Sequence, residues 1–95
     1  MSEVSLRRSA ESEQYEWVVD DRVVSVLGFE ERGSTIVLLH TATDPAARGQ
    51  GHATDLVAAV LQDVADRGLV PSVRCPFIRA YLKKRPTPAA GSTTE

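Results

Sequence analysis

The segment Asp44-Pro-Ala-Ala-Arg-Gly-Gln-Gly-His-Ala-Thr54 contains two glycines that are separated by one residue. An apolar run at residues 36–39 precedes it, and a segment with strong helical periodicity follows. Gly49 and Gly51 permit backbone angles that residues with a Cβ atom resist, and they let a ligand approach the main chain closely. A strand, a glycine turn and a helix start, in that order, direct unpaired N–H groups and the positive end of the helix dipole at an anion. The stretch therefore predicts a site for a phosphate-bearing cofactor.

Two glycines and a proline before a helix are also compatible with an ordinary loop. A Walker loop is excluded, because it needs Gly-x-x-x-x-Gly-Lys-Ser/Thr and the stretch has no lysine. The dinucleotide-binding fingerprint is excluded as well, since its third glycine is missing and no βαβ unit of the right length follows.

The segment Arg48-Gly-Gln-Gly-His-Ala53 resembles the acyl-coenzyme A pyrophosphate loop of the GCN5-related N-acetyltransferases, Arg/Gln-x-x-Gly-x-Gly/Ala. Other marks resemble a small subgroup of minimal, single-domain members of that superfamily. They are His40-Thr41 at the end of the preceding strand, Cys75-Pro-Phe77 after the next strand, and Tyr81 in the last helix. The resemblance runs from about residue 15 to residue 86, and separated motifs in the same order are more specific than the loop alone.

This resemblance implies an acetyl-coenzyme A-dependent N-acetyltransferase or, alternatively, a non-catalytic coenzyme A-binding or protein-interaction module of the same fold. The strands flanking the crossover helix would splay apart, with the pantetheine arm in the gap. The acceptor would be an amine of a small molecule or a protein. The cofactor-binding residues it implies are Thr41, Thr43, Arg48, Gly49, Gln50, Gly51, His52, Ala53 and Thr54. If the family resemblance does not hold, the remaining hypothesis is a generic phosphate- or nucleotide-binding domain.

Two residues are candidates for catalysis. Cys75 lies between a strand and a helix N-terminus with Arg74 and Arg79 near in sequence, a setting that favours a thiolate. It could protonate the departing coenzyme A thiolate or carry the acetyl group, although free cysteines are often small buried hydrophobes. Imidazole titrates near neutral pH, so His40 could take a proton from the acceptor ammonium, or it could be a hydrogen-bonded residue at a strand end.

Other positions receive less specific interpretations. We expect the ring of His52 to be solvated, Tyr81 to pack on the core, and the basic residues 83–85 to form a solvated helix end. Many subgroup members carry a glutamate where this chain has Ala42, which removes the usual carboxylate candidate for a general base. Cofactor binding is still implied after that departure, whereas turnover is less strongly implied.

Composition limits the class of protein. The 95 residues suffice for one domain with a modest core, and no apolar run approaches the roughly 20 residues of a membrane span. One cysteine excludes an internal disulfide and two histidines make a zinc site improbable, so we expect no metal and a cytoplasmic location. The net charge of −2 argues against nucleic acid, and we expect a monomer or weak homodimer without membrane binding.

The patterns predict an α+β fold, and the resemblance implies that it is of the three-layer acetyltransferase kind. It has a mostly antiparallel sheet of about five strands, a crossover helix after the glycine loop and a short C-terminal helix. Strands are expected at residues 4–7, 14–19, 22–29, 35–41 and 69–74, helices at 52–67 and 76–85, a turn at 20–21 and a hairpin loop at 30–33. The run at 36–39 lacks alternation, which predicts a strand covered on both faces. Residues 1–86 form the domain, and 87–95 a disordered tail.

Overall fold

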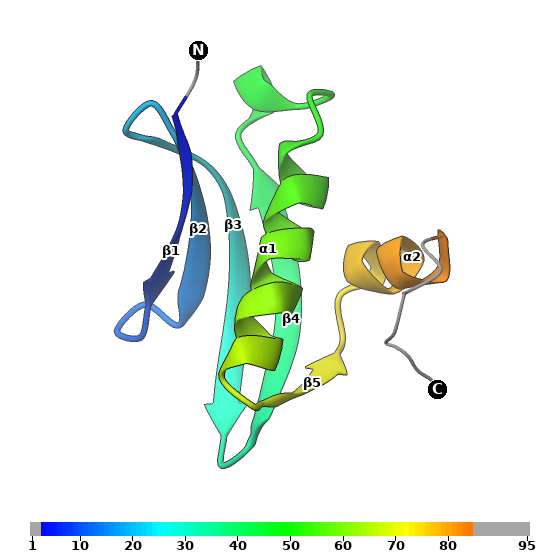
Figure 1. The fold of residues 1–95 in the computed structure, drawn as a ribbon. Helices are drawn as coiled ribbons and strands as arrows, with labels where there is room; N and C mark the ends of the chain where they lie inside the picture. Colours follow the sequence, from blue (N-terminus) through cyan, green and yellow to red (C-terminus); the bar gives the residue numbers. More distant parts are fainter. Residues whose placement is uncertain (1–2, 85–95) are drawn as a thin grey trace.

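The structure of the chain is a computed structural model that describes residues 3–84 (Figure 1). The predicted domain end at residue 86 and the predicted tail at 87–95 lie outside the described residues. The elements in chain order are β1 (Val4–Ser9), β2 (Gln14–Val19), β3 (Arg22–Arg32), β4 (Thr35–Thr43), the 3-10 helix η1 (Pro45–Ala47), α1 (His52–Asp66), β5 (Val70–Val73) and α2 (Pro76–Lys84).

One sheet contains all five strands in the order β1-β2-β3-β4-β5. The first four pair antiparallel with their neighbours, and β5 pairs parallel with β4. α1 connects β4 to β5 and lies across one face of the sheet, while α2 stands beyond the end of β5 (Figure 1). The predicted α+β class, sheet, crossover helix and C-terminal helix are confirmed. No helix of residues 3–84 is long and apolar enough to cross a membrane.

Two short turns join the three strands at the centre of the sheet. At the predicted turn, Asp20 and Asp21 have φ angles of 49° and 68°, and positive φ at both central residues is the requirement of a type I′ hairpin. The hairpin loop predicted at residues 30–33 is wrong, because β3 continues to Arg32, which pairs with Thr35. Gly33 has a φ of 61°, which lets the chain reverse within two residues.

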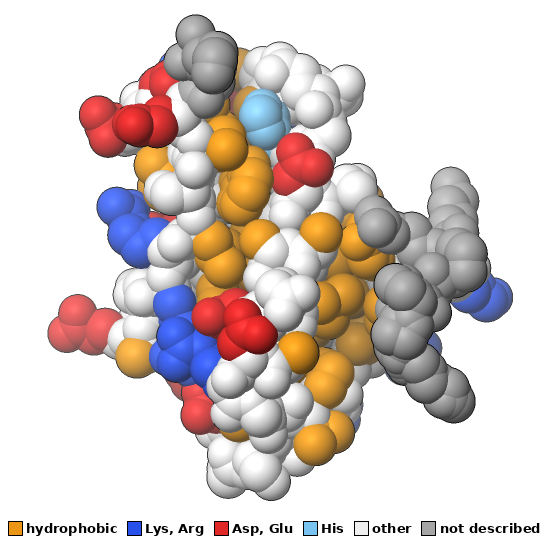
Figure 2. All heavy atoms as spheres, viewed as in Figure 1, with side chains coloured by type: hydrophobic (Ala, Val, Ile, Leu, Met, Phe, Trp, Pro, Cys, Tyr) orange, Lys and Arg blue, Asp and Glu red, His pale blue; other side chains and the backbone are white. Residues whose placement is uncertain are grey.

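The core lies between α1 and the sheet. The helical periodicity expected after the glycine loop is that of α1, whose buried face consists of Leu56, Val57, Val60 and Val64. These side chains form one cluster with buried residues of the sheet and of α2, among them Tyr15, Leu27, Phe29, Ile36, Leu38 and Ile78. Hydrophobic side chains gather along both flanks of α1 on the face shown in Figure 2. Removing this apolar surface from water is the main favourable term in folding.

The apolar run at residues 36–39 is covered on one face, so the prediction of burial on both faces is wrong. Ile36 and Leu38 are fully buried, whereas Leu39 is 39% exposed. A β-bulge accounts for the change, because Phe29 pairs with Leu38 and Gly28 with His40, which leaves Leu39 without a partner on β3.

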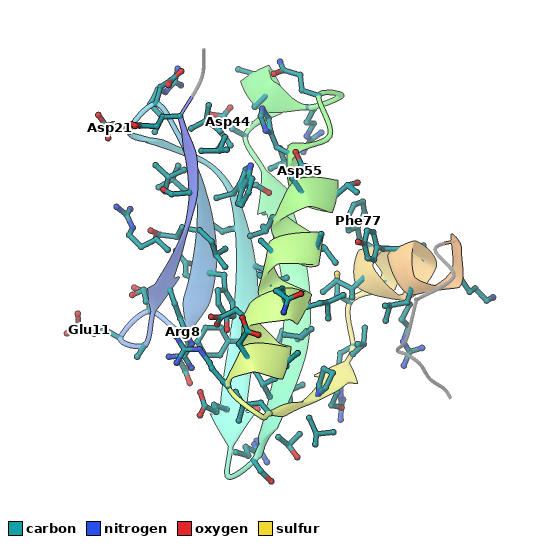
Figure 3. The ribbon with its side chains drawn as sticks, viewed as in Figure 1. Arg8, Glu11, Asp21, Asp44, Asp55 and Phe77 are labelled. Atoms are coloured by element: carbon teal, nitrogen blue, oxygen red, sulfur yellow. The ribbon has the colours of Figure 1, made fainter. Side chains whose placement is uncertain are left out.

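A buried phenol ties α1 to β2. The Tyr15 hydroxyl donates to Asp63 Oδ2 at 2.6 Å, and Arg67 Nε donates to the same oxygen at 2.7 Å. Burial and the hydrogen bond to Asp63 raise the pKa of Tyr15 to about 12. Burial alone would raise the pKa of the Asp63 carboxyl, but the hydrogen bonds from Tyr15 and Arg67 outweigh it and hold that pKa below its ordinary value. Arg8, labelled in Figure 3, lies over the Tyr15 ring.

Candidate cofactor site

β4 and β5 separate halfway along β4. Their parallel pairing covers residues 35–38 of β4 and 70–73 of β5. The Arg74 N–H donates to the Leu38 carbonyl oxygen at 2.9 Å, and no strand of the described residues pairs with β4 on that side after this bond. Residues 39–43 therefore border a gap in the sheet, as the family resemblance implies.

Two threonines direct their main chain into this gap. The Asp44 N–H donates to the Val24 carbonyl oxygen at 2.8 Å, and Thr41 and Thr43 pair with residues 27 and 25 of β3. Hydrogen-bonded and non-hydrogen-bonded pairs alternate along antiparallel strands. The N–H and C=O groups of Thr41 and Thr43 therefore point away from β3, where they are free to hydrogen-bond an extended ligand.

The glycine loop has the backbone conformation that the sequence predicts for it. Gly49 and Gly51 have φ angles of 80° and 81°, and a Cβ atom at either would meet nothing within 4 Å. Gly51 caps α1 without a side-chain hydrogen bond, and the first bond of the helix joins the Asp55 N–H to the Gly51 carbonyl oxygen at 3.0 Å. The N–H groups of residues 52–54 therefore have no partner inside the helix and are available to an anion.

Loop and gap share one open pocket of about 360 Å³. Eight of the nine predicted cofactor-binding residues line it, and Gln50 does not. The described lining residues are Thr41, Ala42, Thr43, Ala47, Arg48, Gly49, Gly51, His52, Ala53, Thr54 and Phe77. They include the cation Arg48 and no carboxylate. Asp55, in the first turn of α1 (Figure 3), lies outside this lining, so the pocket suits a negatively charged group.

The His52 ring differs from the sequence interpretation, and the role of Gln50 in cofactor binding stays a prediction. The His52 ring is partly buried rather than solvated, and among the described residues its Nδ1 is buried without a hydrogen-bond partner. Its Nε2 lies 3.3 Å from Gln50 Oε1. The Gln50 side chain thus lies toward a neighbouring pocket that also contains Asp44 and Arg22. At the first position of a helix the backbone directs the side chain back over the loop, so the expectation of a freely solvated ring is wrong.

Cys75 lies beside the gap but is only 3% exposed. Its Sγ is 3.8 Å from Thr41 Oγ1, a hydrogen-bonding contact between the start of α2 and β4. Ser25, fully enclosed at 2% exposure, lies nearby on the same face, with its Oγ 3.0 Å from Thr43 Oγ1. The hydroxyl groups on this face of β4 are thus held in place. A catalytic role for the thiol stays a prediction.

His40 lies on the other face of the sheet. Neighbouring residues of a strand point to opposite faces, so His40 is turned away from the face on which Thr41 meets Cys75. The imidazole is exposed and lies over Gly28 of β3. The two predicted catalytic side chains therefore border the end of β4 from opposite faces. The role of His40 also stays a prediction.

α2 contributes a residue that we did not predict for the pocket. Phe77 is 40% exposed, lines the pocket and lies on the side of α2 that faces α1 (Figure 3). Its place in the Cys-Pro-Phe motif was the available signal. Tyr81 packs against the core, as predicted. Lys83 is exposed, and Arg85 lies outside the described residues.

A family model and curated relatives match the chain. The model described as GCN5-related N-acetyl-transferase matches residues 14–90. Protein NATD1 from Gallus gallus is 38% identical over 65 residues, which are 67% of this chain and 59% of that protein. Protein NATD1 from Homo sapiens is 38% identical over 65 residues, 58% of its length. The matched segment thus spans less than two thirds of these relatives.

Two solved acetyltransferase structures have a similar fold. An aminoglycoside acetyltransferase from an uncultured soil metagenomic sample, in complex with sisomicin, has a TM-score of 0.56 and 15% identity, with 90% of this chain and 68% of that chain covered. A predicted acetyltransferase with acetyl-CoA from Clostridium acetobutylicum has a TM-score of 0.52 and 16% identity, with 90% and 66% covered. At this identity the likeness concerns the fold alone.

Proposed function

The chain belongs to the GCN5-related N-acetyltransferase family, and we propose that it transfers an acetyl group from acetyl-coenzyme A to an amine. One observation carries the proposal. The pocket joins the unpaired N–H groups at the start of α1 to the free edge of β4, where β5 has separated from it. A diphosphate fits the first part and an extended amide chain the second.

Each part of the pocket has a defined task in binding. The N–H groups of residues 52–54 and the Arg48 guanidinium hold the diphosphate, and the positive φ of Gly49 and Gly51 keeps the loop open around it. The main chain of Thr41 and Thr43 hydrogen-bonds the pantetheine amides. Phe77 covers the arm from the α2 side, and its half-exposed ring supplies apolar contact.

In the transfer, the neutral amine nitrogen attacks the thioester carbonyl carbon, a C–N bond forms and the C–S bond breaks. The amine gives up a proton and the coenzyme A thiolate accepts one, so the products are an acetamide and free coenzyme A. Holding amine and thioester together supplies much of the rate. His40 lies on the open face, where it can take the proton from the amine, and Cys75 lies beside the gap, where its thiol can protonate the leaving sulfur.

A second candidate function is coenzyme A binding without turnover. Two observations favour it: Cys75 is buried, and Ala42 stands two residues after His40 without a carboxylate. The two functions share the pocket. They differ in whether an amine is acetylated on the face of the sheet that carries His40.

Calorimetry and a turnover assay test the proposal. We expect measurable heat when acetyl-coenzyme A is titrated into the protein, and thiol release that depends on an added amine from a panel of small amines and lysine peptides. Heat of acetyl-coenzyme A binding without amine-dependent thiol release would favour coenzyme A binding without turnover. Absence of heat with both coenzyme A and its acetyl ester would contradict both functions.

The proposal also covers the cellular location and the oligomeric state. We propose a reducing location such as the cytoplasm, since the single cysteine is a buried free thiol. We also propose that the protein acts as a monomer or weak homodimer. Analytical ultracentrifugation at several concentrations tests the oligomeric state.

A further inference from the structure

Gly28 is a glycine that the backbone does not require. It lies inside β3, where glycine weakens a strand because it has no side chain to pack. Its φ is not among the positive values of the described residues. An alanine would therefore suit the backbone here, and the reason for glycine must lie in what occupies the space of its missing Cβ.

That space holds the His40 imidazole. A Cβ atom built on Gly28 would lie 2.5 Å from His40 Nε2, 2.9 Å from Cε1 and 3.1 Å from Cδ2. Carbon and nitrogen atoms that are not bonded stay well beyond these distances, so an alanine would displace the ring. The three nearest atoms all belong to the far edge of the imidazole, and thus the ring rests on the backbone of Gly28.

The position of the ring determines which part of the sheet stays uncovered on the face that carries His40. Gly28 and His40 are register partners on neighbouring strands, and β3 and β5 lie on opposite sides of β4. A ring that lies over β3 leaves the lip of the gap between β4 and β5 uncovered. An amine can therefore approach the gap with the imidazole beside it.

We infer that Gly28 is a positioning residue for His40: its missing Cβ leaves the space on β3 that the imidazole occupies, and the ring held there leaves the gap open to the acceptor. This inference rests on the proposed acetyl transfer. It assigns no contact with either substrate to Gly28, which acts through the ring alone.

A pair of double-mutant cycles tests the inference, with Gly28→Ala and His40→Ala made singly and together. The first cycle measures thermal unfolding and needs no activity. Gly28→Ala alone should lower the Tm by only about 2 °C, because the displaced ring belongs to an exposed side chain that can swing aside. In the His40→Ala background the same change should leave the Tm unchanged or raise it, since the clashing atoms are gone. An equal loss in both backgrounds would show that the ring does not rest on Gly28.

The second cycle measures kcat and the KM for acetyl-coenzyme A. Gly28→Ala should lower kcat at least 5-fold with KM unchanged, and should cause no further loss in the His40→Ala background. Equal losses of kcat in both backgrounds, or a change confined to KM, would overturn the positioning role. Absence of turnover in the unaltered protein, with the thermal coupling intact, would instead overturn the proposed acetyl transfer and leave the packing of the pair as observed.

Discussion

Thr41 Oγ1 and Cys75 Sγ lie 3.8 Å apart, and their contact joins β4 to the first turn of α2 beside the gap in the sheet. The thiol is 3% exposed. The contact explains why a cysteine at a helix N-terminus is buried here rather than presented to solvent: the helix is anchored through this residue and Ile78.

This burial predicts slow chemistry at the thiol. A bulky thiol reagent should modify Cys75 on the order of 100-fold more slowly in the native protein than in urea, because attack requires local opening. The measurement is the rate of absorbance change with an aromatic disulfide. Equal modification rates in the native protein and in urea would mean that the thiol is open to solvent. Cys75 would then be the reactive cysteine that the sequence pattern favours.

Gly51→Ala should weaken cofactor binding with a modest loss of stability. A Cβ at φ 81° strains the loop by about 1–2 kcal/mol and moves the N–H groups of the first turn of α1. Gly68→Ala is the matched control, since Gly68 has a φ of 72°, a Cβ there meets nothing within 4 Å, and it lies at the other end of α1. Calorimetry should find at least a tenfold weaker affinity for acetyl-coenzyme A in Gly51→Ala only. Similar affinities in the two variants would contradict a role for the loop.

Phe77→Ala should weaken cofactor binding without unfolding the protein. The ring is 40% exposed and lines the pocket, so its removal leaves little cavity in the core. Loss of apolar contact should raise the Kd about 5- to 20-fold, a cost of about 1–2 kcal/mol. Val70→Ala, at a residue 60% exposed and away from the pocket, is the control. A Kd that is unchanged by Phe77→Ala would show that this residue of α2 does not contribute to cofactor binding.

Tyr15→Phe should change how stability depends on alkaline pH. The pKa of Tyr15 is raised from 10 to about 12 in the folded chain, so the neutral phenol stabilises the fold fully below pH 10. That contribution is lost as pH rises from about 10 to about 12. We expect the free energy of unfolding of the unaltered protein to exceed that of Tyr15→Phe by about 1.5–3 kcal/mol at pH 7. The two free energies should converge near pH 12.

Urea unfolding followed through the single tryptophan measures this difference at each pH. A difference that stays constant from pH 7 to pH 12 would mean that the phenol is not held by burial and by Asp63.

The sequence patterns predicted the elements that local chemistry determines. Two aspartates made the turn at residues 20–21, Gly68 ended α1 with a φ of 72°, and Pro76 began α2. The loop conformation followed in the same way, because glycine has no Cβ atom that opposes positive φ. These features depend on residues adjacent in the chain.

The features that were missed depend on contacts between distant segments. The bulge at Leu39 reverses which residues of β4 face α1, and nothing within the strand signals it. The burial of the His52 ring and the exposure of Phe77 follow from packing around the loop and α2. The separation of Cys75 from His40 by the sheet follows from the alternation of side chains along β4, which requires the register with β3.

We expect the main chain from Gly49 to Thr54, together with Thr41 and Thr43, to hold acetyl-coenzyme A. Titration of the ligand into 15N-labelled protein tests it directly, because each backbone amide reports separately. Saturable shifts should concentrate at the amides of these residues and be absent from residues 4–9 of β1. Saturable shifts centred on another part of the chain, or no shifts at millimolar ligand, would contradict the claim.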